Sequence, residues 1–172
     1  MAKAREIQLT GMDDHVIIHS TEENDRPWIR GVIREWWGAE SVVVRKTKYE
    51  PAEMDGFIAF LNGEKVGLVI LRYEETLCEI MSLTVSGTHP QIDRQLISSA
   101  VEDAKKHNSE RMIVVTTNDN TNALRFYQNF GFRLHELRVG IVKESRKIKP
   151  QIPLIGKYHI PIRDEIELEM IL

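Results

Sequence analysis

The feature that most constrains the fold is a run of apolar residues near the middle of the chain, at positions 65–73. Val66 and positions 68–71 are all apolar, so both faces of a strand built from them have to be buried. Asn62 and Gly63 come before this run and are typical of a two-residue hairpin turn, because that turn needs a positive φ at both central residues. The sequence therefore predicts a hairpin of residues 56–61 and 65–73 inside a sheet that is covered on both faces.

Two strand–helix units follow this hairpin. Positions 78–85 and 111–117 have the apolar, β-branched composition of strands. A helix is predicted after each strand, the first from near Pro90 to about His107, and the second from Asn120 to a terminating glycine, Gly131. Such units pack their helices against a shared sheet.

The remaining segments complete a mixed sheet. A strand at positions 15–20 precedes a helix that has Pro27 in its first turn and ends at Gly38, and the tryptophans of this helix are expected in the core. Positions 41–45 and 132–141 are predicted as strands, and the proline-rich positions 149–161 as a loop. In the last strand, apolar residues alternate with glutamates on a solvated face: Ile166, Leu168 and Met170 with Glu165, Glu167 and Glu169. The predicted fold class is α/β, with helices on both faces of the sheet.

Length and composition limit the classes of protein to which the chain can belong. Its 172 residues, 42% of them hydrophobic, suit one domain at residues 15–172 after a short N-terminal leader at residues 1–14. A net charge of −3, with both signs mixed along the chain, argues against a nucleic-acid partner. No segment resembles a signal peptide or a membrane span, so a cytoplasmic protein without a membrane partner is expected. Cys78 is the single cysteine, which excludes an internal disulfide, and the scattered histidines predict no metal site.

The most specific stretch lies where the second predicted helix begins. Asn120, Ala123, Tyr127, Gly131 and Phe132 follow one another at spacings that resemble those of the Gcn5-related N-acetyltransferases, where this pattern marks half of the acetyl-CoA site. The order of strands and helices extends the resemblance over nearly the whole chain. It implies acetyl-CoA as the co-substrate of this protein.

The same resemblance makes the expected fold more specific. It implies a mostly antiparallel sheet in which the strands at positions 78–85 and 112–117 run parallel and splay apart at their ends. The cleft between them would be lined by Leu83 and Val85, whose backbone would pair with the pantetheine arm. The side chains of Asn120, Tyr127 and Phe126 would face the cofactor from the following helix.

Tyr127 carries the chemistry that the resemblance implies. When an amine attacks a thioester, the departing thiolate needs a proton, and a tyrosine at the start of a helix can donate it as general acid. The alternative is a buried tyrosine that only packs beside Phe126 and Phe130. Asn120 is expected to cap its helix and to contact the cofactor as well.

The other half of the site departs from the family pattern. The family has a loop of the form Arg/Gln-x-x-Gly-x-Gly/Ala, in which the backbone at a helix N-terminus binds the pyrophosphate. Here Thr88 stands at the Arg/Gln position, and Gln91 and Asp93 stand at the two glycine positions. We expect Asp93 to repel the phosphates, with Arg94 offsetting part of its charge. The alternative is that Asp93 caps the helix, in which case changing Gln91 and Asp93 to glycine would lower stability while tightening binding.

A general base is harder to find in the sequence. Glu79, in the strand at positions 78–85, is the best-placed carboxylate by family analogy, although a solvated strand residue explains it equally well. Asp164 and Glu165 are rivals, and water alone would suffice for an exposed amine.

Two functions remain open at this point. The first is an N-acetyltransferase that moves acetyl from acetyl-CoA to the amine of a small molecule or amino acid, with the acceptor held between positions 149–161 and the first helix. The second is a non-catalytic module for ligand sensing or protein binding, with weak or lost coenzyme A binding. A longer acyl group and a homodimer are also left open.

Overall fold

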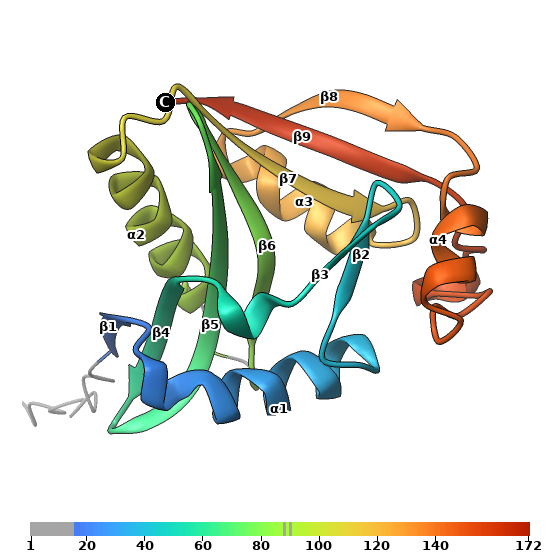
Figure 1. The fold of residues 1–172 in the computed structure, drawn as a ribbon. Coiled ribbons are helices and arrows are strands. Elements are labelled where there is room, and N and C mark those ends of the chain that lie inside the picture. The colour runs from blue at the N-terminus through green and yellow to red at the C-terminus, as the bar shows by residue number, and fades with distance from the viewer. Residues whose placement is uncertain (1–15, 88, 90) are drawn as a thin grey trace, which may run out of the picture.

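The computed structural model describes residues 16–172 apart from 88 and 90, and it forms a seven-stranded sheet in the order β1-β4-β5-β6-β7-β9-β8 (Figure 1). All neighbouring strands are antiparallel except β6 and β7, so the predicted mixed α/β fold is confirmed. The strands of this sheet are β1 (Val16–Ser20), β4 (Gly56–Leu61), β5 (Glu64–Glu74), β6 (Leu77–Val85), β7 (Arg111–Thr117), β8 (Arg133–Arg138) and β9 (Glu165–Ile171).

The sheet is covered on both faces. One buried apolar cluster joins the sheet to helices α2 and α3, and a second joins it to α1 and strand β2. We call these two sides the α2–α3 face and the α1 face. The elements outside the sheet are α1 (Arg26–Trp37), α2 (Ile92–Lys106), α3 (Thr121–Phe130), α4 (Val142–Ile148), the hairpin of β2 (Val42–Val44) with β3 (Thr47–Tyr49), and the short 3-10 turns η1 (Glu23–Asp25), η2 (Pro51–Glu53) and η3 (Lys157–His159). None of the described helices is long and apolar enough to cross a membrane.

The hairpin predicted at the centre of the sheet is confirmed. Asn62 and Gly63 have φ angles of 51° and 87°, as a turn with two left-handed residues requires. The turn joins β4 to β5, and residues 67–71 of β5 are buried on both faces. The sequence pattern located this strand correctly because it is covered by α2 on one side and by α1 on the other.

Helix α1 follows the expected pattern except at its last turn. Ile29 and Ile33 are buried, and Gly38 ends the helix with a φ of 73°. The tryptophans were expected in the core, yet Trp36 is 51% exposed and Trp37 is 43% exposed. The expectation was wrong for these two because the last turn contributes no residue to the apolar cluster beneath the helix.

The C-terminal third contains an unpredicted helix. The strand expected at positions 132–141 ends at Arg138, and after a turn at Gly140 (φ 71°) the chain forms α4. The Gly140 N–H donates a hydrogen bond to the Asp164 carboxylate at 2.8 Å, which fixes this turn. Helix α4 has only seven residues and buries only Val142 and Ser145, so its apolar periodicity is too short to detect in the sequence.

The parting of β6 from β7 positions the candidate site. The two strands pair over only four residue pairs, from Leu77 with Arg111 to Ile80 with Val114. Beyond that point β6 stays paired with β5 as far as Val85, and β7 stays paired with β9 as far as Thr117. Figure 1 shows the two strands diverging from a common end near the C-terminus. The predicted splay is confirmed.

Candidate active site

A β-bulge marks the residue at which β6 leaves β7. Ile80 pairs with Leu71 of β5, and Ser82 pairs with Ile70, so Met81 is an extra residue without a partner on β5. A bulge of this kind removes one residue from the hydrogen-bonded ladder and turns the strand locally. The backbone of Met81 therefore stands at the apex of the parting, where a ligand between the strands would meet it.

Tyr127 belongs to the buried cluster on the α2–α3 face of the sheet. Its residue is only 5% exposed, and its ring packs edge-on against Phe126 and Phe132 at centroid distances of 5.1 Å and 5.3 Å. Burial raises the pKa of the Tyr127 phenol well above its ordinary value, and the negative charge of Asp93 raises it further. The phenol therefore keeps its proton at neutral pH, as a general acid must.

The start of α2 retains the backbone shape of a glycine loop without the glycine. Gln91 is the N-cap residue and has a φ of 81°, a left-handed conformation that favours glycine. Asp93 lies inside the helix, where its carboxylate accepts a hydrogen bond from the Arg94 N–H at 2.8 Å. The alternative that Asp93 is the N-cap was therefore wrong. Thr88 lies outside the described residues, as does the expected helix start at Pro90, and α2 begins at Ile92.

Arg94 reaches from α2 towards α3. Its guanidinium lies over the ring of Phe130, 5.2 Å from the centroid. The start of α2 and the middle of α3 thus bring a cation, the Asp93 carboxylate and the Tyr127 phenol into one region. The cofactor-binding roles expected for Gln91, Asp93 and Arg94 stay predictions.

The start of α3 is tied to a distant loop. Asn120 occupies the N-cap position, but its side-chain oxygen accepts a hydrogen bond from the Lys157 ammonium at 2.9 Å rather than from its own helix. Asp119, which is buried, accepts one from the Lys157 backbone N–H at 3.0 Å. Gly156 is required here because a Cβ would lie 2.0 Å from an Asp119 carboxylate oxygen.

The other end of the same loop is anchored beside α1. The Lys149 ammonium is buried and donates a hydrogen bond to the Ser41 carbonyl oxygen at 2.7 Å, and its desolvation lowers the pKa of Lys149. Residues 149–157 therefore form a strap, anchored between α1 and β2 at one end and at the start of α3 at the other. Trp37 lies nearby on α1 and donates a hydrogen bond to Ser82 of β6 at 3.3 Å.

On the α1 face, Glu79 is held between two arginines. It is 1% exposed, and its carboxylate accepts hydrogen bonds from Arg45 at 2.7 Å and from Arg72 at 2.8 Å and 3.2 Å. Arg45 stands at the turn of the β2–β3 hairpin, with a left-handed φ of 50°. The ion pairs therefore fasten the tip of this hairpin onto the sheet, and Glu79 is no solvated strand residue.

Two further carboxylates lie on the same face. The last strand was expected to expose its glutamates, but Glu165 and Glu167 are 3% and 6% exposed, so that expectation was wrong for both. Glu167 accepts a hydrogen bond from Arg138 at 2.7 Å, and Glu165 accepts one from the Arg45 backbone N–H. Both glutamates are buried by partners that are distant in sequence, so the alternation of residues within the strand could not reveal their burial. The described residues include no group of three or more His, Cys, Asp or Glu that could hold a metal ion.

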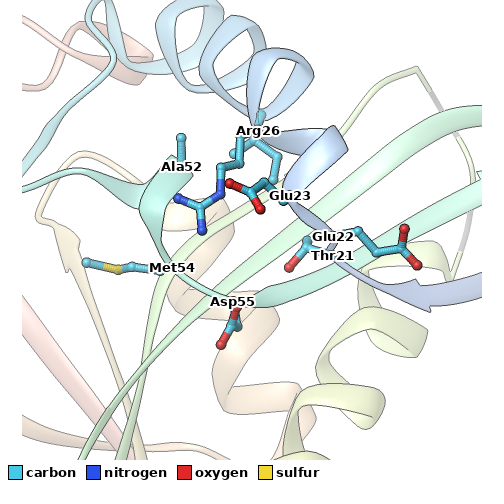
Figure 2. Close-up of a pocket in the computed structure, with 8 residues that line it drawn as sticks. Thr21, Glu22, Glu23, Arg26, Ala52, Met54 and Asp55 are labelled. Atoms are coloured by element: carbon cyan, nitrogen blue, oxygen red, sulfur yellow. The ribbon is translucent and has the colours of Figure 1, made fainter.

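A small surface pocket lies away from this constellation. It is lined by residues at the ends of β1 and η2 and the start of α1, among them Thr21, Arg26, Met54 and Asp55 (Figure 2). None of the residues predicted for the site belongs to it. The parting of β6 and β7 is therefore the better candidate for the chemistry.

The sequence identified the site residues that belong to a local motif. It missed those that only the tertiary structure brings to the site. Met81, Arg45 and Trp37 were not singled out, because a bulge, a turn arginine and an exposed tryptophan have no local pattern. Two positive φ angles at Arg45 and Lys46, without glycine, mark the hairpin as unusual only once the backbone is seen.

Comparison with known proteins agrees with this architecture. A model described as "Acetyltransferase (GNAT) family" matches residues 17–132. The uncharacterized protein YxbD of Bacillus subtilis (strain 168) is 38% identical over 142 residues, which cover 81% of this chain and 89% of YxbD.

Solved structures share the fold over almost the whole chain. The IAA acetyltransferase from Bacillus cereus ATCC 14579 has a TM-score of 0.71 at 22% identity, covering 92% of this chain and 100% of its own. A GNAT family acetyltransferase from Elizabethkingia anophelis with acetyl-CoA bound has a TM-score of 0.67 at 21% identity, covering 93% and 100%. From the family match and the identity to YxbD, the chain belongs to the acetyltransferase (GNAT) family.

Proposed function

We propose that the protein transfers acetyl from acetyl-CoA to the amine of a small molecule or amino acid. The observation that carries this proposal is the parting of β6 from β7, with the bulge of Met81 at its apex and the buried Tyr127 in the cluster that packs on the α2–α3 face of these strands. A core needs no hydroxyl at this position. Family membership and a structural neighbour with acetyl-CoA bound support the same reading.

The cofactor would enter between the separated strands. Its pantetheine arm would pair with the backbone of β6 near Leu83 and Val85, where β7 is no longer paired with β6 in the described part of the chain. Its pyrophosphate would lie at the start of α2, beside Thr88, Gln91, Asp93 and Arg94. Asn120 and Phe126 would face it from α3.

The chemistry would then use both sides of the parting. The Met81 N–H would bind the carbonyl oxygen of the thioester and stabilise the oxyanion that forms when the amine attacks. Tyr127 would donate its proton to the departing thiolate. Glu79 as general base stays a prediction, but taking up a proton there would disrupt hydrogen bonds from two guanidiniums.

The non-catalytic module is the second candidate, and the side chains of Gln91 and Asp93 at the expected phosphate site favour it. Calorimetric titration with acetyl-CoA, followed by an assay for thiol release with a library of amines, separates the two functions. Binding with amine-dependent thiol release supports the enzyme. No acetyl-CoA binding, or binding with no release for any amine, supports the module.

A further inference from the structure

Three buried carboxylates lie on the α1 face beside the parting, and they differ in what holds them. Glu79 accepts hydrogen bonds from two guanidiniums, and Glu167 accepts one from Arg138. Glu165 accepts hydrogen bonds only from a backbone N–H, that of Arg45, at 3.1 Å and 3.2 Å to its two oxygens, within the part of the chain that the structure describes. Glu165 can therefore take up a proton without breaking an ion pair.

Its position in the sheet also differs. Glu165 pairs across the ladder with Thr117, the last residue of β7, and so lies beside the segment of β7 that has left β6. Glu79 pairs with Ile113, where β6 and β7 are still joined. We expect the acceptor amine to arrive from the α1 face, because Tyr127, Phe126 and α2 pack together on the opposite side. Glu165 thus lies one strand beyond the parting, next to the part of β7 that borders the opening, with its side chain on the α1 face.

We propose that Glu165 is the general base of the reaction, and that Arg45 and Glu79 are positioning residues that hold it. The proposal rests on acetyl transfer being the function. The ion pair of Arg45 with Glu79 fixes the tip of the β2–β3 hairpin, and the backbone N–H at that tip binds the Glu165 carboxylate. Arg45 therefore spans the sheet from β9 to β6, over the place where the strands separate.

The electrostatic surroundings of Glu165 agree with this role. Burial raises the pKa of the Glu165 carboxyl above its ordinary value. The Arg45 N–H and the positive charges of Arg138 and Arg45 lower this pKa in part, and the negative charge of Glu79 raises it. A raised pKa brings a carboxylate closer to the pH at which it exchanges protons efficiently with an amine.

The proton balance is complete with the groups named. The Glu165 carboxylate takes one proton from the acceptor ammonium, and the neutral amine attacks the thioester carbonyl to form a C–N bond. As the C–S bond breaks, Tyr127 gives its proton to the thiolate and regains one from the nitrogen that becomes the amide. The products are the amide, coenzyme A as the thiol, and one proton that Glu165 releases to solvent.

The test compares two amines of nearly the same shape. Ethylamine is protonated at neutral pH and needs a base, whereas 2,2,2-trifluoroethylamine is largely neutral and does not. We expect Glu165→Gln to lower kcat/KM for ethylamine by about 10²–10⁴-fold, and for trifluoroethylamine by no more than about tenfold. In Glu165→Gln the rate with ethylamine should instead rise steadily with pH across the neutral range, because it then follows the fraction of free amine rather than the ionisation of a carboxyl group.

A matched control lies on the same strand and the same face. Glu169 pairs with Ile113 of β7, forms an ion pair with Arg111, and lies 3.1 Å from the Nδ1 atom of His135, away from the open end. Glu169→Gln should leave kcat/KM for both amines, and the pH profile with ethylamine, as they are in the wild type.

The outcomes separate the two proposals. Full activity of Glu165→Gln with ethylamine, or equal loss with both amines while acetyl-CoA binding is intact, would overturn the role of Glu165. A wild-type chain that binds no acetyl-CoA and releases no thiol with either amine would overturn the proposed function itself.

Discussion

At the scale of single residues, the site depends on burial that changes the proton affinity of a side chain. Tyr127 is enclosed by aromatic rings, and its phenol loses the water that would stabilise a phenolate. The same packing would be found around a purely structural tyrosine. What distinguishes the two roles is the effect of removing only the hydroxyl.

Tyr127→Phe should lower kcat by about 10²–10⁴-fold and leave the Kd for acetyl-CoA nearly unchanged, because the ring and its packing remain. Tyr73→Phe is the matched control. Its hydroxyl donates a hydrogen bond to Asp103 at 2.5 Å, so its loss should reduce the unfolding free energy by about 1 kcal/mol and spare catalysis. Steady-state kinetics and calorimetry check both, and unchanged turnover in Tyr127→Phe would refute the general acid.

Glu165 gives a second prediction at this scale, through the pH dependence of stability. Because the folded-state pKa of Glu165 is raised, the folded protein binds more protons than the unfolded chain between the two pKa values. This carboxyl therefore reduces stability as pH rises through that window. The unfolding free energy of Glu165→Gln, relative to wild type, should increase from pH 4 to pH 7. Denaturant titrations at both pH values measure it, and a decrease would show that the charges around Glu165 outweigh its burial.

At the scale of elements, the start of α2 has a left-handed backbone conformation that favours glycine, but the residue there is Gln91. A non-glycine residue in the left-handed region is strained by about 1 kcal/mol. Gln91→Gly should therefore raise the unfolding free energy by about 1 kcal/mol, whereas the sequence led us to expect a loss for the double change with Asp93. Gln91→Ala keeps the strain and should stay within about 0.5 kcal/mol of wild type.

The same change should affect binding, because the side chain of Gln91 stands where we expect the pyrophosphate. Gln91→Gly should tighten acetyl-CoA binding by roughly tenfold, equivalent to about 1.4 kcal/mol. Titration calorimetry at matched salt compares the two variants with wild type. Gln91→Ala removes most of the same bulk and should gain most of this affinity, whereas no gain in either variant would show that the Gln91 side chain does not crowd the pyrophosphate.

The strap of residues 149–157 is the second element whose role can be tested. Gly156→Ala would place a methyl group against Asp119, so it should lower the unfolding free energy by about 1–3 kcal/mol and raise KM for the amine. Gly31 lies in the middle of α1 with open space around it, so Gly31→Ala should instead raise stability by about 0.5–1 kcal/mol. Thermal unfolding and amine saturation curves compare the two variants. If Gly156→Ala changed stability and KM no more than Gly31→Ala does, the contact of Gly156 with Asp119 would have no role in holding the strap.

At the scale of the whole molecule, the sequence predicted what local patterns determine. The hairpin at Asn62 and Gly63, the two strand–helix units and the parting of β6 from β7 were all anticipated, the last through the family motif around Tyr127. The contacts between arginines and glutamates on the α1 face were not, because Arg45 is 120 positions from Glu165, which the sequence offered only as a rival base. Helix α4 was missed because it is too short for its periodicity to be recognised.

The parting divides the sheet into two halves that share only the four pairs between β6 and β7. A ligand that pairs with β6 beyond Ile80 would supply the hydrogen bonds that β7 no longer makes, and it would bind the folded state alone. Acetyl-CoA at about 100 times its Kd should then raise the unfolding free energy by about 2.7 kcal/mol. Amide hydrogen exchange should slow most at Met81–Val85 of β6, and the slowing in β1 and β4, which the ligand does not reach, should not exceed that given by the higher global stability. Equal protection throughout the sheet would mean general stabilisation, whereas protection confined to the open end of β6 would place the cofactor between the separated strands.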